Sequence, residues 1–454
     1  MSGGRVVVVG GGLAGLAAAT GLVRRGHDVT LLEARARLGG ATFSFERDGL
    51  AVDNGQHVLL RCYTEYREFL DVLGVGDKIA LQDRFHIPVI TADGRRGELS
   101  RNNLPAPLHL APTLAGYRLL SRGDRARVLM AAGLLRTLNP ADPRLDDRSF
   151  ADWLVRHGQR PAAIDALWNL ITVAALNTDA AHASLALCAM VFRTALLERA
   201  DAADIGVPTL PLGELHGDAA ERYLTAHGAK VCTHTAVRQI RTVGDGFEVV
   251  LDGDTIPADA VVVAAPPEPT AAMLPPGALE HPERLAELGG APIVNVHTVY
   301  DRRVTGDPFT AVVGSPVQWV FDRSEIAAVN NDTVDGGQYL AVSLSAAERW
   351  IDTPTARLRD VFLPEMAKLF PAAATAEVTR FFVTRERRAT FRQAPGSAGL
   401  RPPARTGLPG CVLAGAWTAT GWPDTMEGAV RSGNEAARLA DARLVGIAAL
   451  GSAA

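Results

Sequence analysis

Residues 5–15 read Arg5-Val-Val-Val-Val9-Gly10-Gly-Gly-Leu-Ala-Gly15, and this stretch decides the fold class. A short β-branched run that ends in glycine predicts a buried strand over residues 5–9. The apolar spacing that follows predicts a helix over residues 13–25, and a second buried strand follows over residues 29–32. Glu33 ends this second strand, eighteen residues after Gly15. These offsets predict a dinucleotide-binding unit of the Rossmann type and therefore an α/β fold.

The glycines of this turn have separate roles in binding a dinucleotide. Gly10 permits the tight turn, Gly12 lets backbone N–H groups approach a pyrophosphate, and Gly15 lets the helix pack closely on the strand. Leu13 and Ala14 open the helix, whose N-terminus carries partial positive charge that favours phosphate. The turn therefore predicts where the phosphates of a bound cofactor lie.

Glu33 completes this predicted site. Its carboxylate can accept hydrogen bonds from both hydroxyls of the cofactor's ribose. At this stage the fingerprint fits either NAD or FAD.

Composition excludes several other classes of protein. The chain has 454 residues, with 47% apolar and 21% charged residues, which is an ordinary globular mixture. The net charge of −4 argues against a general nucleic-acid binder. The four cysteines form no C-x-x-C pair, and no histidine cluster has zinc spacing, so we expect reduced thiols, no metal and a cytoplasmic protein. An isolated Asp146-Asp147 pair lacks the repeated aspartates of a magnesium–diphosphate site.

The uncharged run over residues 6–23 has an alternative interpretation as a signal peptide or membrane anchor. Its valines, glycines and alanines fit a strand, a turn and a helix better than a membrane span, which would carry leucine and phenylalanine. We therefore expect a soluble or peripheral protein.

The residues after Glu33 distinguish between the two cofactors. They read Ala34-Arg35-Ala36-Arg37-Leu38-Gly39-Gly40, which resembles the E-A-R-x-x-x-G-G-R extension of the amine oxidase and phytoene desaturase superfamily of flavoproteins. The resemblance implies FAD, with Ala34, Arg35, Gly39 and Gly40 at its pyrophosphate and ribose. Ala41 stands where the superfamily usually has arginine, so that phosphate contact is not carried over.

Two distant segments extend the same resemblance. Strand-like runs over residues 230–233, 247–251 and 260–264 resemble the second FAD segment, in which the backbone of Val237 would pair with adenine. An unrelated β-meander is the alternative for this stretch.

Near the C-terminus, a short buried strand ends at Gly415, and Thr425-Met426-Glu-Gly-Ala-Val opens a helix whose N-terminus would point at the flavin pyrimidine ring. Ala416 replaces the usual aspartate, so the ribityl contact is not carried over either.

These segments predict the domain organisation. Residues 1–85, 205–265 and 395–440 would form a discontinuous FAD-binding domain of the Rossmann type. An inserted substrate domain would be formed by residues 86–204 and 266–394. The first of these segments looks mainly helical, and the second mixes strands and helices.

The most specific stretch is residues 52–66, VDNGQHVLLRCYTEY. Together with the C-terminal T-x-T-G-W-P-x-T-M-E-G-A-V-R-S-G, it resembles the bacterial hydroxysqualene dehydroxylases, within the same superfamily. The resemblance implies reductive removal of a hydroxyl from hydroxysqualene, a hydrophobic isoprenoid, to give squalene. It places Asp53, Gly55, Gln56 and His57 beside the flavin. His57 is the first candidate for the acid that protonates the leaving hydroxyl, with a simple flavin- or backbone-binding role as the alternative, and Asp53 is expected to be structural.

Four other functional questions stay open in the sequence. A carotenoid-type desaturase or an amine oxidase shares the cofactor frame, although Lys368 is the only late lysine that could stand near flavin N5. A non-catalytic lipid carrier is a third hypothesis, against which the retained glycine turn and Glu33 argue. The electron donor is not identified, since the single dinucleotide fingerprint is assigned to FAD.

The arginines and apolar residues of 116–136 fit either a peripheral membrane surface, within a membrane-facing part at 110–140, or a solvated helix.

Overall fold

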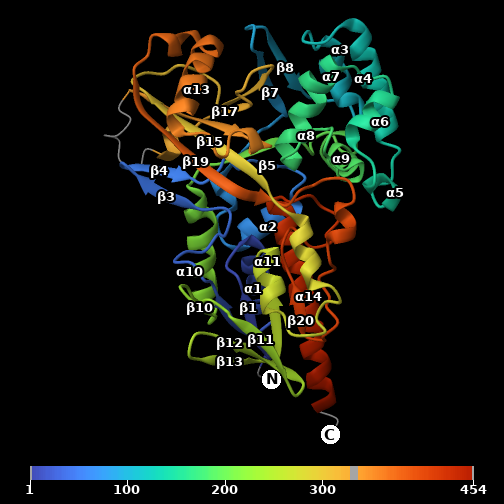
Figure 1. Cartoon of the computed structure of the whole chain (residues 1–454), viewed down its shortest axis with the longest axis vertical. Coiled ribbons are helices and arrows are strands. Elements are labelled where there is room, and N and C mark those ends of the chain that lie inside the picture. Colours follow the sequence, from blue (N-terminus) through green and yellow to red (C-terminus); the bar gives the residue numbers. More distant parts are fainter. Residues whose placement is uncertain (1–2, 328–335, 452–454) are drawn as a thin grey trace.

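A five-stranded parallel sheet forms the lower half of the molecule, and its strands come from distant parts of the chain (Figure 1). The structure is a computed structural model that describes residues 3–327 and 336–451. The order is β10-β2-β1-β14-β20, with bounds β1 Arg5–Val9, β2 Asp28–Leu32, β10 Lys230–Cys232, β14 Ala260–Val263 and β20 Cys411–Leu413. This confirms the predicted α/β fold with a Rossmann-like sheet.

Both faces of this sheet are covered, which explains why β1 is apolar at four successive positions. Val6 and Val8 pack against helices α1 (Leu13–Val23), α10 (Ala219–Ala226) and α14 (Met426–Gly451). Val7 and Val9 face a three-stranded antiparallel sheet made of β11 (Gln239–Val243), β12 (Gly246–Val250) and β13 (Thr255–Ala258), together with α11 (Pro267–Met273). Since side chains alternate along a strand, only a continuous apolar run satisfies both faces.

A seven-stranded mixed sheet lies above the first, with the order β19-β15-β18-β17-β16-β7-β8. Its bounds are β7 His86–Thr91, β8 Arg96–Ser100, β15 Ala291–Tyr300, β16 Phe309–Val313, β17 Trp319–Asp322, β18 Gln338–Leu344 and β19 Val378–Thr390. Helix α13 (Thr355–Leu369) covers one face of this sheet. The short helix α12 (Ser324–Ala327) follows β17.

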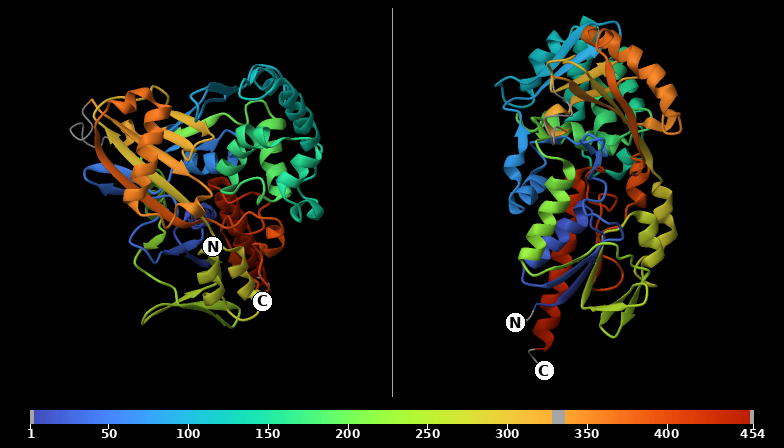
Figure 2. Two further views of the ribbon diagram at one scale, coloured as in Figure 1. Left: turned by 45° about the horizontal axis from the view of Figure 1, so that its top comes forward. Right: turned by 90° about the vertical axis from the view of Figure 1, so that its left-hand side faces the viewer.

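A helical lobe lies beside the seven-stranded sheet, at the same end of the molecule (Figure 2). Its helices are α3 Ala111–Gly116, α4 Arg122–Leu135, α5 Pro143–Asp146, α6 Phe150–Arg156, α7 Pro161–Ala163, α8 Asn169–Leu176 and α9 Leu185–Phe192. The expectation that residues 86–204 are mainly helical therefore needs one correction, since β7 and β8 begin this segment and complete the seven-stranded sheet. Pairing of β7 with β16, more than 200 residues later in the chain, is the long-range contact that the local sequence does not reveal.

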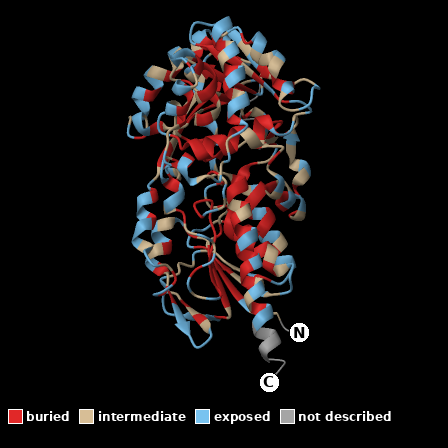
Figure 3. Ribbon diagram, turned by 90° about the vertical axis from the view of Figure 1, so that its right-hand side faces the viewer, coloured by how far each residue is buried: buried red, intermediate tan, exposed pale blue. Residues whose placement is uncertain are grey.

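Smaller elements join the two halves. A hairpin of β3 (Ser44–Arg47) and β4 (Leu50–Asp53) leads into the segment 52–66, and helix α2 (Thr64–Val72) follows that segment. Strands β5 (Leu59–Leu60) and β6 (Ile79–Leu81) pair with β9 (Ile205–Pro208). Buried residues run through both sheets and along the inner side of α14, while outer helix faces are exposed (Figure 3). All four cysteines are free thiols.

Candidate functional site

The glycine turn between β1 and α1 is shaped for close approach of a ligand. Gly10 has φ of 107°, a conformation that favours glycine, and a Cβ on Gly15 would lie 1.9 Å from the Gly10 carbonyl oxygen. Helix α1 begins at Leu13 with neither a side-chain cap nor an acid in its first turn. The first N–H groups of α1, including those of Leu13 and Ala14, therefore have no intrahelical acceptor and can bind phosphate oxygens.

Glu33 lies at the end of β2, where it joins the turn to the next loop. Its side chain is buried, with Oε2 accepting the N–H of Gly11 at 2.7 Å and Oε1 accepting the N–H of Arg35 at 2.8 Å. Each carboxylate oxygen keeps a further lone pair for a ribose hydroxyl. Glu33 thus positions the turn and keeps acceptor capacity for the ribose that the sequence predicts there.

The loop after Glu33 packs directly on the glycine turn. The N–H of Gly39 donates to the Gly11 carbonyl oxygen at 2.8 Å, and a Cβ on Gly40 would lie 2.7 Å from the Cα of Gly12. Both glycines have positive φ, 96° and 59°. The side chains of Ala34, Arg35 and Ala41 are exposed.

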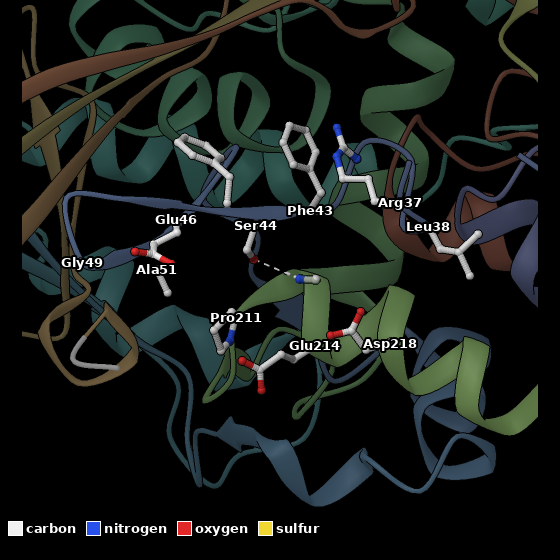
Figure 4. A pocket seen from close by; sticks show the side chains of 12 residues that line it. Arg37, Leu38, Phe43, Ser44, Glu46, Gly49, Ala51, Pro211, Glu214 and Asp218 are labelled. Carbon is white, nitrogen blue, oxygen red and sulfur yellow. Dashed lines mark hydrogen bonds between the residues drawn. The ribbon is translucent and has the colours of Figure 1, made fainter. Parts of the chain in front are cut away.

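A groove of about 320 Å³ borders this loop (Figure 4). Arg37 lies over the ring of Phe43 at its rim, and Ser44 accepts a hydrogen bond from the N–H of Gly213. Three carboxylates, Glu46, Glu214 and Asp218, also line the groove. This acidic lining does not suit a hydrocarbon, so the groove is not a candidate for the isoprenoid site.

Asp53 lies in a buried ion pair and does not face an open site. Its carboxylate accepts hydrogen bonds from Arg323, from the hydroxyl of Ser44 at 2.5 Å and from the N–H of Leu212 at 3.0 Å. The side chains of Asp53 and Arg323 are only 3% and 7% exposed. This geometry supports the structural role expected for Asp53, because it ties β4 to the segment that leads into α12.

Gly55, Gln56 and His57 follow as a turn at the end of β4. The buried Gln56 Oε1 has no hydrogen-bond partner among the described residues. The amide of Asn295, from β15, donates to the Asn54 carbonyl at 3.1 Å, and the Asn295 Oδ1 is a second buried atom without a partner among residues 3–327 and 336–451. Unpaired buried oxygens are costly, so both atoms fit a site that a polar ligand completes.

The environment of His57 favours the binding role over the acid role. Burial lowers the pKa of His57 below its ordinary value, and it outweighs the hydrogen bond to Gly55 and the charge of Asp53, which both raise that pKa. The ring Nδ1 lies 3.1 Å from the Gly55 carbonyl oxygen, which can only accept, so this nitrogen carries the proton. The neutral ring then presents Nε2 as an acceptor, which cannot donate a proton.

The start of α14 offers free N–H groups. Thr425 caps the helix, since its hydroxyl accepts the N–H of Gly428 at 3.2 Å. The N–H groups of Met426 and Glu427 have no intrahelical acceptor and can stabilise negative charge on a bound ring. The Met426 side chain is itself packed in the core beside α1.

Another glycine with positive φ follows β20. Gly415 has φ of 145°, and a Cβ there would lie 2.3 Å from Nε1 of Trp417. Ala416 is buried and brings no polar group in place of the usual aspartate. Val237 lies in the loop between β10 and β11, outside the strand pairs, so its backbone can bind adenine.

Comparison with known proteins identifies the family. Residues 13–440 match the family described as flavin containing amine oxidoreductase. The chain belongs to this family. A hydroxysqualene dehydroxylase from Rhodopseudomonas palustris is 32% identical to this flavin oxidoreductase, over 96% of this chain and 97% of the relative. The 15-cis-phytoene desaturase of Solanum lycopersicum is 27% identical, over 94% of this chain and 76% of the relative.

Solved structures support the same fold. Cyclohexylamine oxidase from Brevibacterium oxydans has a TM-score of 0.71 at 20% identity, covering 98% of this chain and 100% of the neighbour. A putrescine oxidase structure with bound putrescine gives a TM-score of 0.71 at 21% identity, covering 96% and 98%. The family match and the hydroxysqualene dehydroxylase relative show that the protein is an FAD-dependent oxidoreductase. The free helix N-termini and the unpaired oxygens fit this cofactor. Among the residues that the structure describes, no group of three or more His, Cys, Asp or Glu side chains could hold a metal ion.

Glu427 has a role that sequence reasoning missed. Its carboxylate is fully buried and accepts the N–H groups of Glu65 at 3.2 Å and Tyr66 at 2.8 Å, at the start of α2. Arg431 pairs with it at 2.7 Å. Glu427 therefore fixes the segment that follows His57 to the start of α14.

Replacing Glu33 with alanine is expected to weaken FAD binding at least about tenfold, because hydrogen bonds to a charged group contribute about 1.5–3 kcal/mol each. The variant loses the contacts to Gly11 and Arg35 as well as the ribose acceptors. Titration of apoprotein with FAD measures the change. Glu280→Ala is the control, since that side chain is 92% exposed. Unchanged affinity in Glu33→Ala would show that the fingerprint is misassigned.

FAD is expected to be bound without a covalent link. Burial raises the pKa of Cys411, on β20, and of Cys62, before α2, to about 12, so neither thiol is a ready nucleophile. Acid precipitation should therefore release all yellow colour into the supernatant. Colour that stays with the pellet would contradict this prediction.

Proposed function

We propose that the protein reductively removes the hydroxyl group of hydroxysqualene to give squalene. The observation that carries the proposal is similarity along nearly the whole chain to proteins named hydroxysqualene dehydroxylase, at 32% and 29% identity. The relative named phytoene desaturase, at 27% identity, makes an oxidative isoprenoid reaction the second candidate.

The helical lobe supports a hydrocarbon substrate. One continuous apolar cluster runs from α3 and α4 through α8 and α9 to Val58, Tyr63 and Trp422, the last of which precedes α14. Within this cluster lies a cavity of about 50 Å³ without polar surface, lined by residues such as Val128, Ile171 and Leu196. Apolar surface of this kind favours hydrocarbon over water, and a dry site protects a cationic centre on the substrate.

The three lysines weigh against an amine oxidase. Lys368 lies on α13, exposed and paired with Glu365 at 2.6 Å. Lys78 pairs with Asp77 near the surface, and Lys230 is exposed on β10. None of the three lies at the candidate site.

Reduced FAD supplies a hydride when bound, and the chain supplies the environment. In this proposal Gly10–Gly15, Glu33 and the loop through Gly40 hold the dinucleotide, while Gln56, His57 and the start of α14 bind the ring. The three segments that contribute strands to the Rossmann sheet form the FAD-binding domain, and residues 86–204 and 266–394 form the substrate domain. A separate electron donor reduces the flavin.

Anaerobic incubation of photoreduced enzyme with hydroxysqualene tests the proposal. Reoxidation of the flavin together with formation of squalene is the expected result. Reoxidation by a quinone or an imine without squalene would overturn it. Conversion of phytoene by oxidised enzyme would favour the second candidate.

A surface on the helical lobe supports peripheral contact with the cytoplasmic membrane. It combines the exposed arginines Arg118 and Arg122 with exposed apolar side chains, namely Leu104, Leu108, Leu129, Met130 and Leu134. Basic and apolar groups together favour an anionic lipid surface. None of the helices described is both long and apolar enough to cross a bilayer.

The double substitution Leu108→Glu, Met130→Glu is expected to reduce co-flotation with anionic vesicles several-fold, because each glutamate removes apolar contact and repels anionic lipid. The two side chains are 55% and 56% exposed, so the fold should tolerate the change. Val445→Glu, at a 60% exposed position near the far end of α14, is the matched control. Equal flotation of all three proteins would contradict the proposed surface.

A further inference from the structure

Asp424 lies where three parts of the chain meet at the N-terminal end of α14. It stands two residues before Met426, the first residue of that helix. Its carboxylate Oδ2 accepts the N–H of Phe391, directly after β19, at 2.8 Å. Its own N–H donates to Gln393, whose amide donates to the carbonyl of Leu176 at the end of α8. The helix, the seven-stranded sheet and the helical lobe thus converge on this carboxyl group.

The carboxyl group has few stabilising partners for an ionised form. Hydrogen bonds of the described residues engage only Oδ2, which leaves Oδ1 for a ligand. Arg401 is the charged group that acts on Asp424, with Asp146 beyond it. The Nη2 of Arg401 is already bound to the carbonyl oxygens of Ala416, Thr418 and Trp422. Burial raises the pKa of Asp424 to about 6, so about a tenth of the molecules carries the proton at pH 7, far more than for an ordinary aspartate.

The other titratable groups around the site are poorer proton donors. Burial lowers the pKa of His57, and it lowers the pKa of His297 to about 3, so burial disfavours the protonated form of both rings. The nitrogens of His297 already bond Tyr339 at 2.7 Å and Thr384 at 3.1 Å. Glu427 is occupied by two backbone N–H groups and by Arg431. Asp424 combines an oxygen that no described residue engages with a pKa raised towards neutral.

We propose that Asp424 is the catalytic acid that protonates the leaving hydroxyl of the substrate. This role rests on the proposed function. The carbon–oxygen bond breaks as the leaving oxygen takes the proton of Asp424, which gives water. The substrate carbon would gain a hydride from reduced FAD, which would lose two electrons. The carboxylate then regains a proton from solvent. This assigns to Asp424 the task that the sequence had suggested for His57.

The first test is Asp424→Asn, which keeps an oxygen acceptor for the Phe391 N–H but holds no acidic proton. Single-turnover formation of squalene should slow by roughly 10²–10⁴-fold, the usual contribution of general acid catalysis. FAD content should stay unchanged. In the wild type the rate should fall as pH rises through about 6, since the protonated form is active. This alkaline limb of the pH–rate profile should be absent from the variant. Asp252→Asn, on an exposed hairpin, is the control.

Two further measurements separate a chemical role from a structural one. The acetate ester of hydroxysqualene has a better leaving group, so the difference between wild type and Asp424→Asn should shrink towards unity with this substrate. In oxidised enzyme without substrate, the infrared band of a protonated carboxyl should titrate near pH 6 and be absent from the variant. If Asp424→Asn fails to retain FAD, Asp424→Glu should retain the pH limb.

Several outcomes overturn this role. Equal rates of squalene formation by wild type and Asp424→Asn would exclude Asp424 while leaving the proposed function intact. Equal losses on the alcohol and the ester would indicate a structural effect. If Asp424→Asn keeps the alkaline limb of the pH–rate profile and His57→Ala loses it, then His57 is the proton donor. Absence of squalene from the wild type would overturn the proposed function and this role with it.

Discussion

Arg323→Met is expected to lower the free energy of unfolding by about 3–5 kcal/mol, because it leaves a buried carboxylate without its charged partner. Arg323 and Asp53 are both almost completely buried, and the pair joins β4 to the segment before α12. Asp53 also holds Ser44 and Leu212. Loss of the arginine should therefore loosen the turn of Gly55, Gln56 and His57 and weaken FAD retention as well.

Guanidinium unfolding followed by tryptophan fluorescence, with flavin release measured in parallel, tests this prediction. The control is Arg238→Met, since Arg238 and Asp252 form an ion pair with side chains 60% and 73% exposed, and such pairs contribute about 0–1 kcal/mol. The double substitution Asp53→Asn, Arg323→Met removes both charges, so it should cost less than the sum of the two single changes. Additive single effects would show that the two side chains are not coupled.

The flavin-binding half could be predicted because its signals are local. Turn glycines, the buried strand and Glu33 lie within a few tens of residues, and their spacing is set by the geometry of one strand–helix–strand unit. The structure has β1 at the predicted bounds and α1 and β2 within two residues of theirs. The C-terminal helix begins at Met426, one residue after the predicted start.

The remaining parts depend on contacts that no local pattern encodes. Arg323 lies 270 residues from Asp53, so nothing near either residue reveals the pair. Glu427 belongs to a quoted motif, yet its partners on α2 lie more than 350 residues earlier. Likewise, burial and the Gly55 carbonyl determine the charge of the His57 ring and which of its nitrogens carries a proton. Only the folded site supplies these surroundings. A titratable residue type identifies a candidate, while its surroundings decide its charge.

Gly433→Ala is expected to destabilise the protein by about 1–3 kcal/mol or more and to release FAD, because overpacking forces two helices apart. Gly433 lies on the face of α14 that packs against α1. A Cβ there would lie 2.2 Å from the Ala14 carbonyl oxygen and 2.8 Å from the Ala17 Cβ. Both contacts belong to well-packed parts of α1, which cannot yield without moving the helix. Since the N-termini of α1 and α14 both belong to the proposed FAD site, one added methyl group should disturb two parts of that site.

The matched control is Gly446→Ala on the same helix, where an added Cβ would meet nothing within 4 Å. At that position alanine should leave stability unchanged or raise it by about 0.5–1 kcal/mol, since glycine is a poor helix former. Thermal unfolding of both variants, with and without added FAD, separates packing from helix propensity. Because the destabilisation acts through the cofactor-binding frame, excess FAD should restore part of the lost stability in Gly433→Ala. If both variants melt together with the wild type and retain FAD, close packing of α1 on α14 does not hold the site together.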